Sequence, residues 1–323
     1  MHATISVGMG IQARADLRTF GRKLEGMAAC LLPFEEDGRI AREAFQDAVR
    51  RTEEAGLKCA VNMDTGYANY LTEEERKDVL AWTREALGPD KPFVAGVFVE
   101  GLEGDLVNLY RTGGDQIAEF GGTPILFQTT RFHDWSSDEI VKLYADVCQN
   151  YDSVLGFELG KMFAPNGMIY SEEVVQGLMG IPSLKGMKHS SLSRGEELKR
   201  LALRDEVRPD FRIYTGNDLG IDMIEYGSDY LLGLAAFCPE KFAERDRLWE
   251  QGDEAYHELN DALQYLGNVA FREDVPAYKH SCAVFQYLLG RIPSSEPHPM
   301  CPRRPEWEAG MLSDCAKRLG YSL

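Results

Sequence analysis

The segment SLKGMKHSS, residues 183–191, places a lysine close to the polar end of a run that otherwise looks like a β-strand. If it is a strand, side-chain alternation puts Leu184, Gly186 and Lys188 on one face, and the apolar character of the run makes that face the buried one. Burial lowers the pKa of a lysine because it disfavours the ammonium, and a neutral amine forms Schiff bases with carbonyl compounds. Lys188 is therefore either a Schiff-base nucleophile or a strand-end lysine that reaches solvent, and the segment alone leaves both open.

Short apolar runs recur along the chain, and most of them end in polar or acidic residues. Segments with helical periodicity separate them, and several of these begin at Ser or Thr with acidic residues in the first turn, which is a helix-start signal. Strand and helix in alternation predict an α/β fold, a (β/α)8 TIM barrel. A doubly wound open sheet is the competing architecture, but no G-x-G-x-x-G follows the first strand. The eight strand-like runs begin at Gly26, Cys59, Phe93, Thr123, Val154, Leu184, Arg212 and Asp229.

The strand-like runs stop after about residue 253, and three helical patterns follow. They cover residues 254–271, 277–290 and 304–320, and a proline-rich link separates the last two. The prediction is a barrel with a C-terminal three-helix extension. We expect an N-terminal segment (1–25), the barrel (26–253) and the helical extension (254–323).

The composition is that of a soluble globular protein, with 44% hydrophobic and 27% charged residues among 323. A formal net charge of -17 argues against nucleic acid or an anionic membrane as a partner, because both are negatively charged. No apolar run approaches the ~20 residues of a membrane span, and the N-terminus lacks the apolar core of a signal peptide. The seven cysteines are scattered without a C-x-x-C spacing, which predicts reduced thiols in a cytoplasmic protein.

Four motifs appear in order at the ends of the predicted strands, where a barrel carries its chemistry. They are L-x-P-F-x-x-D-G at 31–38, DTGYANYLTEEER at 64–76, G-x-K-x-S-S at 186–191 and TGND at 215–218. In order and spacing the chain resembles the family of dihydrodipicolinate synthase and N-acetylneuraminate lyase, the class I aldolases and lyases. The resemblance implies that Lys188 forms a Schiff base with a pyruvate-like 2-keto acid or an aldehyde. It also implies no metal or organic cofactor and a homotetramer or homodimer.

The resemblance assigns substrate-binding roles to two loops. In the family, the loop after the second strand holds the keto-acid carboxylate through hydroxyl and backbone N–H groups, here those of Thr65 and Gly66. Asp64 stands where the family has threonine, and a carboxylate there would repel that of the substrate. Either the substrate lacks a carboxylate at this point, or Asp64 is protonated or turned away from it. In the turn after the seventh strand, Thr215 and Gly216 are the expected substrate-binding residues.

The fifth strand departs from the family pattern. The family has a Y-N-x-P motif there, whose tyrosine relays protons during Schiff-base formation and bond cleavage. The aligned run, residues 154–167, has Phe157 in that place and about three extra residues. Phenylalanine can line the substrate pocket, but it cannot relay a proton. The aromatic pair that the synthases carry on the fourth strand is also missing, so synthesis of a lysine precursor is not expected.

The acid/base group is therefore open. Glu158 and His133 are the first candidates, although Glu158 faces the other side of the strand from Phe157 and could instead pair with Lys161. Strand alternation also turns His189 away from Lys188. In the loop after the fourth strand, Arg131 is expected to receive an anionic substrate group. The full set of acid/base candidates is Glu158, His133, His189 and Tyr67.

The leading hypothesis is a Schiff-base lyase, that is an aldolase, synthase or dehydratase, acting on a 2-keto acid such as pyruvate or a sugar-derived keto acid. A divalent-metal barrel lyase or isomerase is one alternative, but it leaves the lysine motif unexplained. A non-catalytic binding homologue that has lost the relay tyrosine is the other. The metal alternative draws its ligands from Asp64, Glu100, Glu158, His189 and Asp218.

Overall fold

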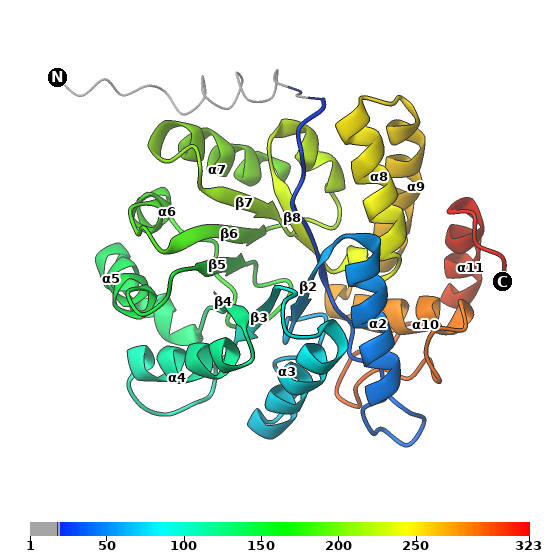
Figure 1. Ribbon diagram of the computed structural model, residues 1–323, viewed down its shortest axis with the longest axis horizontal. Helices are drawn as coiled ribbons and strands as arrows, with labels where there is room; N and C mark the ends of the chain where they lie inside the picture. Colours follow the sequence, from blue (N-terminus) through cyan, green and yellow to red (C-terminus); the bar gives the residue numbers. More distant parts are fainter. Residues whose placement is uncertain (1–17, 19) are drawn as a thin grey trace.

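The chain folds into a closed barrel of parallel strands surrounded by helices (Figure 1). The computed structural model describes residue 18 and residues 20–323, so most of the predicted N-terminal segment, 1–25, lies outside the described residues. Each strand pairs with its neighbours in chain order, and β1 pairs with β8 to close the barrel. The predicted (β/α)8 fold is confirmed. The strands are β1 Gly26–Ala29, β2 Lys58–Val61, β3 Phe93–Val97, β4 Gly122–Leu126, β5 Val154–Leu159, β6 Leu184–Ser190, β7 Arg212–Thr215 and β8 Asp229–Leu232.

The outer layer consists of helices that pack their apolar stripes on the barrel. The Ser and Thr start signals are borne out, since α3 and α5 begin with capping boxes built by Thr72 with Glu75 and by Ser136 with Glu139. These caps satisfy backbone N–H groups that a first turn leaves without partners. The layer contains α2 Arg42–Ala55, α3 Glu73–Leu87, α4 Leu106–Glu119, α5 Ser137–Cys148, α6 Glu172–Met179, α7 Arg194–Val207 and α8 Pro239–Gln251.

The predicted C-terminal extension is also present. It comprises α9 Ala255–Ala270, α10 Tyr278–Leu288 and α11 Glu308–Arg318, which Figure 1 shows gathered with α8 on one side of the barrel. The proline-rich link between α10 and α11 returns to the barrel, where the ring of His298 stacks on Tyr70 with 5.0 Å between centroids. The extension therefore reaches the loops that follow the first strands.

Short 3-10 turns complete the connections: η1 Thr130–Asp134 after β4, η2 Ile221–Tyr226 after β7, η3 Leu234–Ala236 after β8 and η4 Val275–Ala277 before α10. The strands are almost wholly buried because helices cover the outside and side chains fill the inside. All seven cysteines are buried and free. In the described part of the chain, no helix combines the length and the apolar character needed to cross a bilayer.

Candidate functional site

Lys188 lies on β6 between Phe157 of β5 and Tyr214 of β7, and only 6% of it is exposed. Its amine makes no hydrogen bond or ion pair with any described residue, and its nearest ring is that of Phe157, 4.7 Å from Nζ to the centroid. Burial lowers the pKa of Lys188 to about 8, against the opposing charges of Asp218 and Asp64. A substantial fraction of the amine is therefore neutral near pH 8, as a Schiff-base nucleophile requires.

The floor under this amine is aromatic. Phe157 is fully buried and packs edge-on against Phe127, with 4.9 Å between ring centroids. An aromatic face attracts a cation, but it neither gives nor takes a proton. A group that moves protons at this amine must therefore be a residue other than Phe157.

Ser190 and Gly216 form the wall beside the lysine. Gly216 N–H donates to the His189 carbonyl at 2.7 Å and thereby joins the turn after β7 to β6. A Cβ at Gly216 would lie 2.6 Å from Lys188 Cε and 2.0 Å from Ser190 Oγ, so only glycine leaves room for both side chains. The Ser190 hydroxyl is buried and has no hydrogen-bond partner among the described residues. This wall thus holds a free hydroxyl close to the amine.

Asp218 is a buried carboxyl in the same turn, and 4% of it is exposed. One carboxylate oxygen accepts from Leu234 N–H at 2.7 Å. Burial raises the pKa of Asp218 to about 7, although the Leu234 N–H and the charge of Lys188 act in the other direction. Sequence reasoning considered this residue only as a metal ligand, although its place two residues after Gly216 already put it at the end of a barrel strand.

Asp64 is turned toward the C-terminal extension. Lys279 Nζ lies 3.1 Å from one carboxylate oxygen, and Tyr278 OH donates to the other at 2.9 Å. Tyr278 OH also shares a hydrogen bond of 2.8 Å with Thr65 Oγ1. The Asp64 carboxylate is therefore paired with Lys279 while its charge still acts on Lys188, an arrangement that the sequence did not predict. The two α10 residues were missed, because nothing in the sequence connects them to the second strand.

The Gly66 N–H does not fit its expected role. It donates to the Met63 carbonyl at 3.0 Å within its own turn, so it is not free to receive a substrate carboxylate. The expected role of Thr215 meets the same difficulty, since its hydroxyl donates to Glu197 on α7 at 2.8 Å. Of the expected substrate-binding residues, Gly216 and Phe157 border the amine, and Thr65 lies in the loop beside Asp64.

Glu158 and His189 lie on the outer side of the barrel wall, in a buried network with Arg200 of α7. His189 Nδ1 is 2.6 Å from Glu158 Oε1, and Arg200 Nε donates to the same oxygen at 2.8 Å. The proposed pairing of Glu158 with Lys161 is not seen. Strand alternation explains the outcome: residues next to Phe157 and Lys188 must face away from the pocket. The prediction that Glu158 supplies the acid/base group is therefore wrong, because its side chain lies on the opposite side of the barrel wall from Lys188.

The chain Ser191, His189 and Glu158 has the order of a hydrolase triad, with 2.6 Å from Ser191 Oγ to His189 Nε2. Ser191 Oγ, however, accepts from Ser193 N–H at 3.0 Å, at the N-cap position of α7. The three side chains fix the start of α7 on the barrel wall. These contacts are those of a structural network.

His133 and Arg131 lie on η1 at the rim, and both are exposed. Arg131 donates to the Gly104 carbonyl at 2.9 Å and borders an outer groove between α4 and α5. No contact among the described residues joins either side chain to Lys188. The structure does not bring these two candidates to the amine.

Two curated enzymes are similar to this chain in sequence. No family model matches it. It is 25% identical over 256 residues to the 4-hydroxy-tetrahydrodipicolinate synthase of Sodalis glossinidius, a match covering 77% of this chain and 84% of that protein. Against the enzyme of the same name from Kosmotoga olearia it is 23% identical over 255 residues, covering 77% and 83%.

Solved structures share the fold over nearly the whole chain. Dihydrodipicolinate synthase from Thermotoga maritima gives a TM-score of 0.79 at 17% identity, covering 93% of this chain and 99% of that one. The enzyme from Acinetobacter baumannii, solved with pyruvate, gives 0.77 at 18% identity, covering 93% and 99%.

The chain is similar in sequence to 4-hydroxy-tetrahydrodipicolinate synthases and similar in fold to dihydrodipicolinate synthases.

The ligands that the metal alternative requires do not lie together in the described part of the chain. Asp64 and Asp218 face the lysine side of the barrel, whereas Glu158 and His189 are paired on the outer side. Glu100 accepts from Thr130 N–H at 2.8 Å at the rim. Among the described residues, no group of three or more His, Cys, Asp or Glu is arranged to hold a metal ion.

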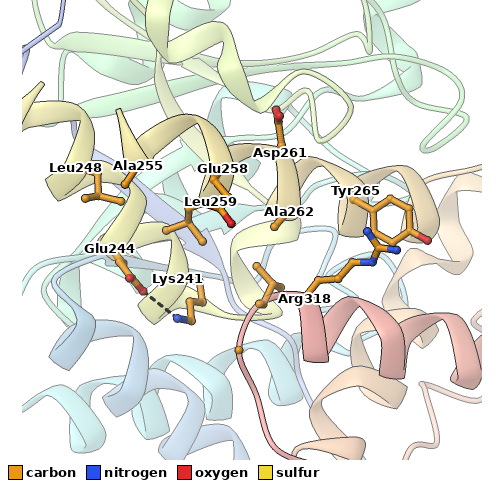
Figure 2. Close-up of a pocket in the computed structure, with 12 residues that line it drawn as sticks. Lys241, Glu244, Leu248, Ala255, Glu258, Leu259, Asp261, Ala262, Tyr265 and Arg318 are labelled. Carbon is orange, nitrogen blue, oxygen red and sulfur yellow. Dashed lines mark hydrogen bonds and ion pairs between the residues drawn. The ribbon is translucent and has the colours of Figure 1, made fainter. Parts of the chain in front are cut away.

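A groove on the protein surface lies away from Lys188. The groove has a volume of about 680 Å³ and lies between α8, α9 and α11. Figure 2 shows Lys241 paired to Glu244 at one end and Arg318 over the Tyr265 ring at the other. The groove contains neither the lysine motif nor a strand end. Size alone therefore does not identify the site, and the chemistry at β6 does.

Proposed function

We propose that this protein is a class I lyase that acts on a 2-keto acid, such as pyruvate or a sugar-derived keto acid, or on a related aldehyde, with Lys188 as the Schiff-base nucleophile. The observation that carries the proposal is the buried amine on β6, which has no ion pair among residues 18 and 20–323 and whose pKa burial lowers to about 8. The relatives support the class, since they are named as synthases and one neighbour was solved with pyruvate.

The chemistry follows from that amine. Neutral Lys188 attacks the carbonyl carbon, a C–N bond forms, and the carbonyl oxygen leaves as water to give an iminium ion. The iminium accepts the electron pair that remains when a bond at the adjacent carbon breaks. Phe157 lies under Nζ, and the burial of the amine favours the neutral form that starts each cycle.

The substrate should differ from that of the named relatives. Asp64 and Lys279 form a buried pair beside Thr65, so the loop that holds the keto-acid carboxylate in the family carries its own charges here. Phe157 removes the family tyrosine from the other side of the pocket. We therefore propose an aldolase, synthase or dehydratase whose reaction is not the synthesis of the lysine precursor.

We also propose a cytoplasmic homotetramer or homodimer that binds small molecules and has no nucleic-acid or membrane partner. The oligomer rests on family likeness, and the choice of partner rests on the net charge of -17. Sedimentation and nucleic-acid or vesicle binding assays measure the two properties separately.

Borohydride trapping tests the proposal. The protein is incubated with pyruvate, 2-oxobutanoate or glyceraldehyde, reduced, and examined by intact-mass and peptide mass spectrometry. The expected result is one adduct per chain on the Lys188 peptide, lost in Lys188→Ala and unaffected by EDTA. Lys185→Ala is the matched control, because Lys185 is exposed on the same strand and bonds the Pro182 carbonyl. No adduct from any carbonyl compound, together with activity abolished by EDTA, would overturn the proposal.

A further inference from the structure

We propose that Asp218 is the proton-transfer residue of this site, in place of the tyrosine that Phe157 replaces, and that the Ser190 hydroxyl assists it. The inference rests on the proposed Schiff-base function and goes beyond it by assigning the acid/base role. The candidates first expected, Glu158 and His133, lie on the outer wall and at the exposed rim.

The strand pairing brings Asp218 to the lysine. Gly216 packs on Lys188 Cε and is tied to β6 through its N–H, and Asp218 follows two residues later. The carboxyl is buried and forms no ion pair or side-chain hydrogen bond with any described residue, apart from its acceptance of the Leu234 N–H. A buried carboxyl without a charged partner is costly to maintain, so its presence here requires a reason.

The C-terminal extension holds the Asp218 turn in place. Gln264 Nε2 of α9 donates to the Asp218 carbonyl at 3.1 Å, and Gln264 Oε1 accepts from Ile221 N–H at 3.1 Å. A Cβ at Gly267 would lie 2.6 Å from the Asp218 carbonyl oxygen, so glycine permits the close approach of the helix. The carboxyl is thus fixed from both sides, through α9 and through η3, as a proton-transfer residue must be.

Ser190 provides the second, independent observation. It is two residues after Lys188 on the same strand, so both side chains point to the barrel interior. Its hydroxyl is buried and has no hydrogen-bond partner within the described part of the chain. A Cβ at Gly216 would meet both Ser190 Oγ, at 2.0 Å, and Lys188 Cε, at 2.6 Å, so the two side chains lie close together. A hydroxyl in that position can pass a proton from the attacking nitrogen to the carbonyl oxygen.

The proton balance closes with one carboxyl. Attack by neutral Lys188 forms the C–N bond, and the Ser190 hydroxyl takes a proton from nitrogen as it gives one to oxygen, which yields the carbinolamine. Protonated Asp218 then donates to the carbinolamine hydroxyl, which leaves as water and leaves an iminium ion and a carboxylate. That carboxylate removes a proton from the carbon next to the iminium carbon, which yields the enamine and restores the acid. No oxidant, reductant or metal is required.

The titration of the pair supports this cycle. Burial raises the pKa of Asp218 to about 7 and lowers that of Lys188 to about 8. The charged or titratable groups that face Asp218 are Lys188 on β6, Asp64 after β2 and Tyr278 on α10. Near neutral pH, a neutral amine beside a protonated acid is therefore an accessible state, and it is the state from which the cycle starts.

Asp218→Asn separates proton transfer from imine formation. The amide oxygen can still accept from Leu234 N–H, and loss of the carboxylate charge favours the neutral amine of Lys188, so the trapped adduct should form at equilibrium. Exchange of deuterium from solvent into the carbon next to the carbonyl should instead fall by roughly 10²- to 10⁴-fold. The probe is pyruvate or 2-oxobutanoate, whichever gives more adduct with the parent, and NMR follows the exchange.

The controls distinguish the outcomes. Asp222→Asn removes the same charge from η2, where Asp222 pairs with Arg194, and exchange should stay within about two-fold of the parent. Asp218→Ala with added formate is the second variant, and formate should restore part of the exchange. Normal exchange in Asp218→Asn with a normal adduct would overturn this inference alone. An absence of adduct in the parent would overturn the proposed function, and the inference with it.

Discussion

Replacement of Glu158 by glutamine tests whether the structure assigns this residue correctly. Glu158 is fully buried and accepts four hydrogen bonds: one each from Tyr170 N–H and His189 Nδ1, and two from Arg200. A glutamine has one acceptor oxygen, and its amide nitrogen must face a donor. Glu158→Gln therefore leaves the Arg200 guanidinium buried without its counter-ion.

The expected loss of unfolding free energy is roughly 3–5 kcal/mol, the cost of breaking a buried ion pair by removal of one partner. The pH dependence gives a similar figure. Burial alone would raise the pKa of Glu158, but His189 and Arg200 outweigh it and lower the pKa to about 2. A carboxylate with a lowered folded-state pKa stabilises above its unfolded pKa of about 4.5, and this contribution, about 3 kcal/mol, disappears as the pH falls to about 2.

Urea unfolding at pH 7 measures the change, with Glu173→Gln as the control. Glu173 is an exposed glutamate in the first turn of α6, so its replacement should change the unfolding free energy by less than about 0.5 kcal/mol. A loss below about 1 kcal/mol in Glu158→Gln would refute the structural assignment. A large loss of turnover with unchanged stability would make Glu158 a catalytic candidate again.

Four further outcomes are expected. The rate of imine formation, quenched by borohydride, should rise from pH 6 to a maximum between the pKa of Asp218, about 7, and that of Lys188, about 8, because the reaction needs a neutral amine and a protonated acid; a flat profile would contradict this. Gly216→Ala should reduce the trapped adduct at least ten-fold, since the new Cβ would meet Lys188 Cε and Ser190 Oγ. A full yield of adduct by mass spectrometry would count against close packing beside the amine. Lys279→Met should lower the unfolding free energy by roughly 3–5 kcal/mol, because it leaves the Asp64 carboxylate buried without its counter-ion. Urea unfolding measures this loss, and an unchanged midpoint would disprove the prediction. Sedimentation at micromolar concentration should give a dimer or tetramer, and a monomer would be decisive against family-like assembly.

The barrel could be predicted because its signals are local. Each strand is a short apolar run, and helices such as α3 and α5 begin where Ser or Thr precedes acidic residues. The side of the wall that a residue faces also follows from the alternation along a strand. That rule placed Lys188 inside and turned His189 away from it. It also pointed Glu158 to the other face, yet Glu158 was kept as a first acid/base candidate, which the structure corrects.

The partners of these residues could not be predicted, because they come from distant elements. Tyr278 and Lys279 reach Asp64 from α10, more than two hundred residues further along the chain. Arg200 reaches Glu158 from α7 by the same kind of packing. Sequence periodicity tells which face of a helix is buried, but not which loop that face meets. The Asp218 carboxyl was overlooked for a related reason: its isolation from charged partners is a property of the folded pocket.

The most direct test of Schiff-base chemistry at Lys188 is a crystal structure of the protein soaked with the carbonyl compound that gives the trapped adduct. We expect continuous density from Lys188 Nζ to the former carbonyl carbon, with Phe157 beneath the new bond and the Asp218 carboxyl within hydrogen-bonding distance of the adjacent carbon or its attached oxygen. Density for the compound attached to another lysine, or bound without a covalent bond while Lys188 remains free, would contradict the assignment.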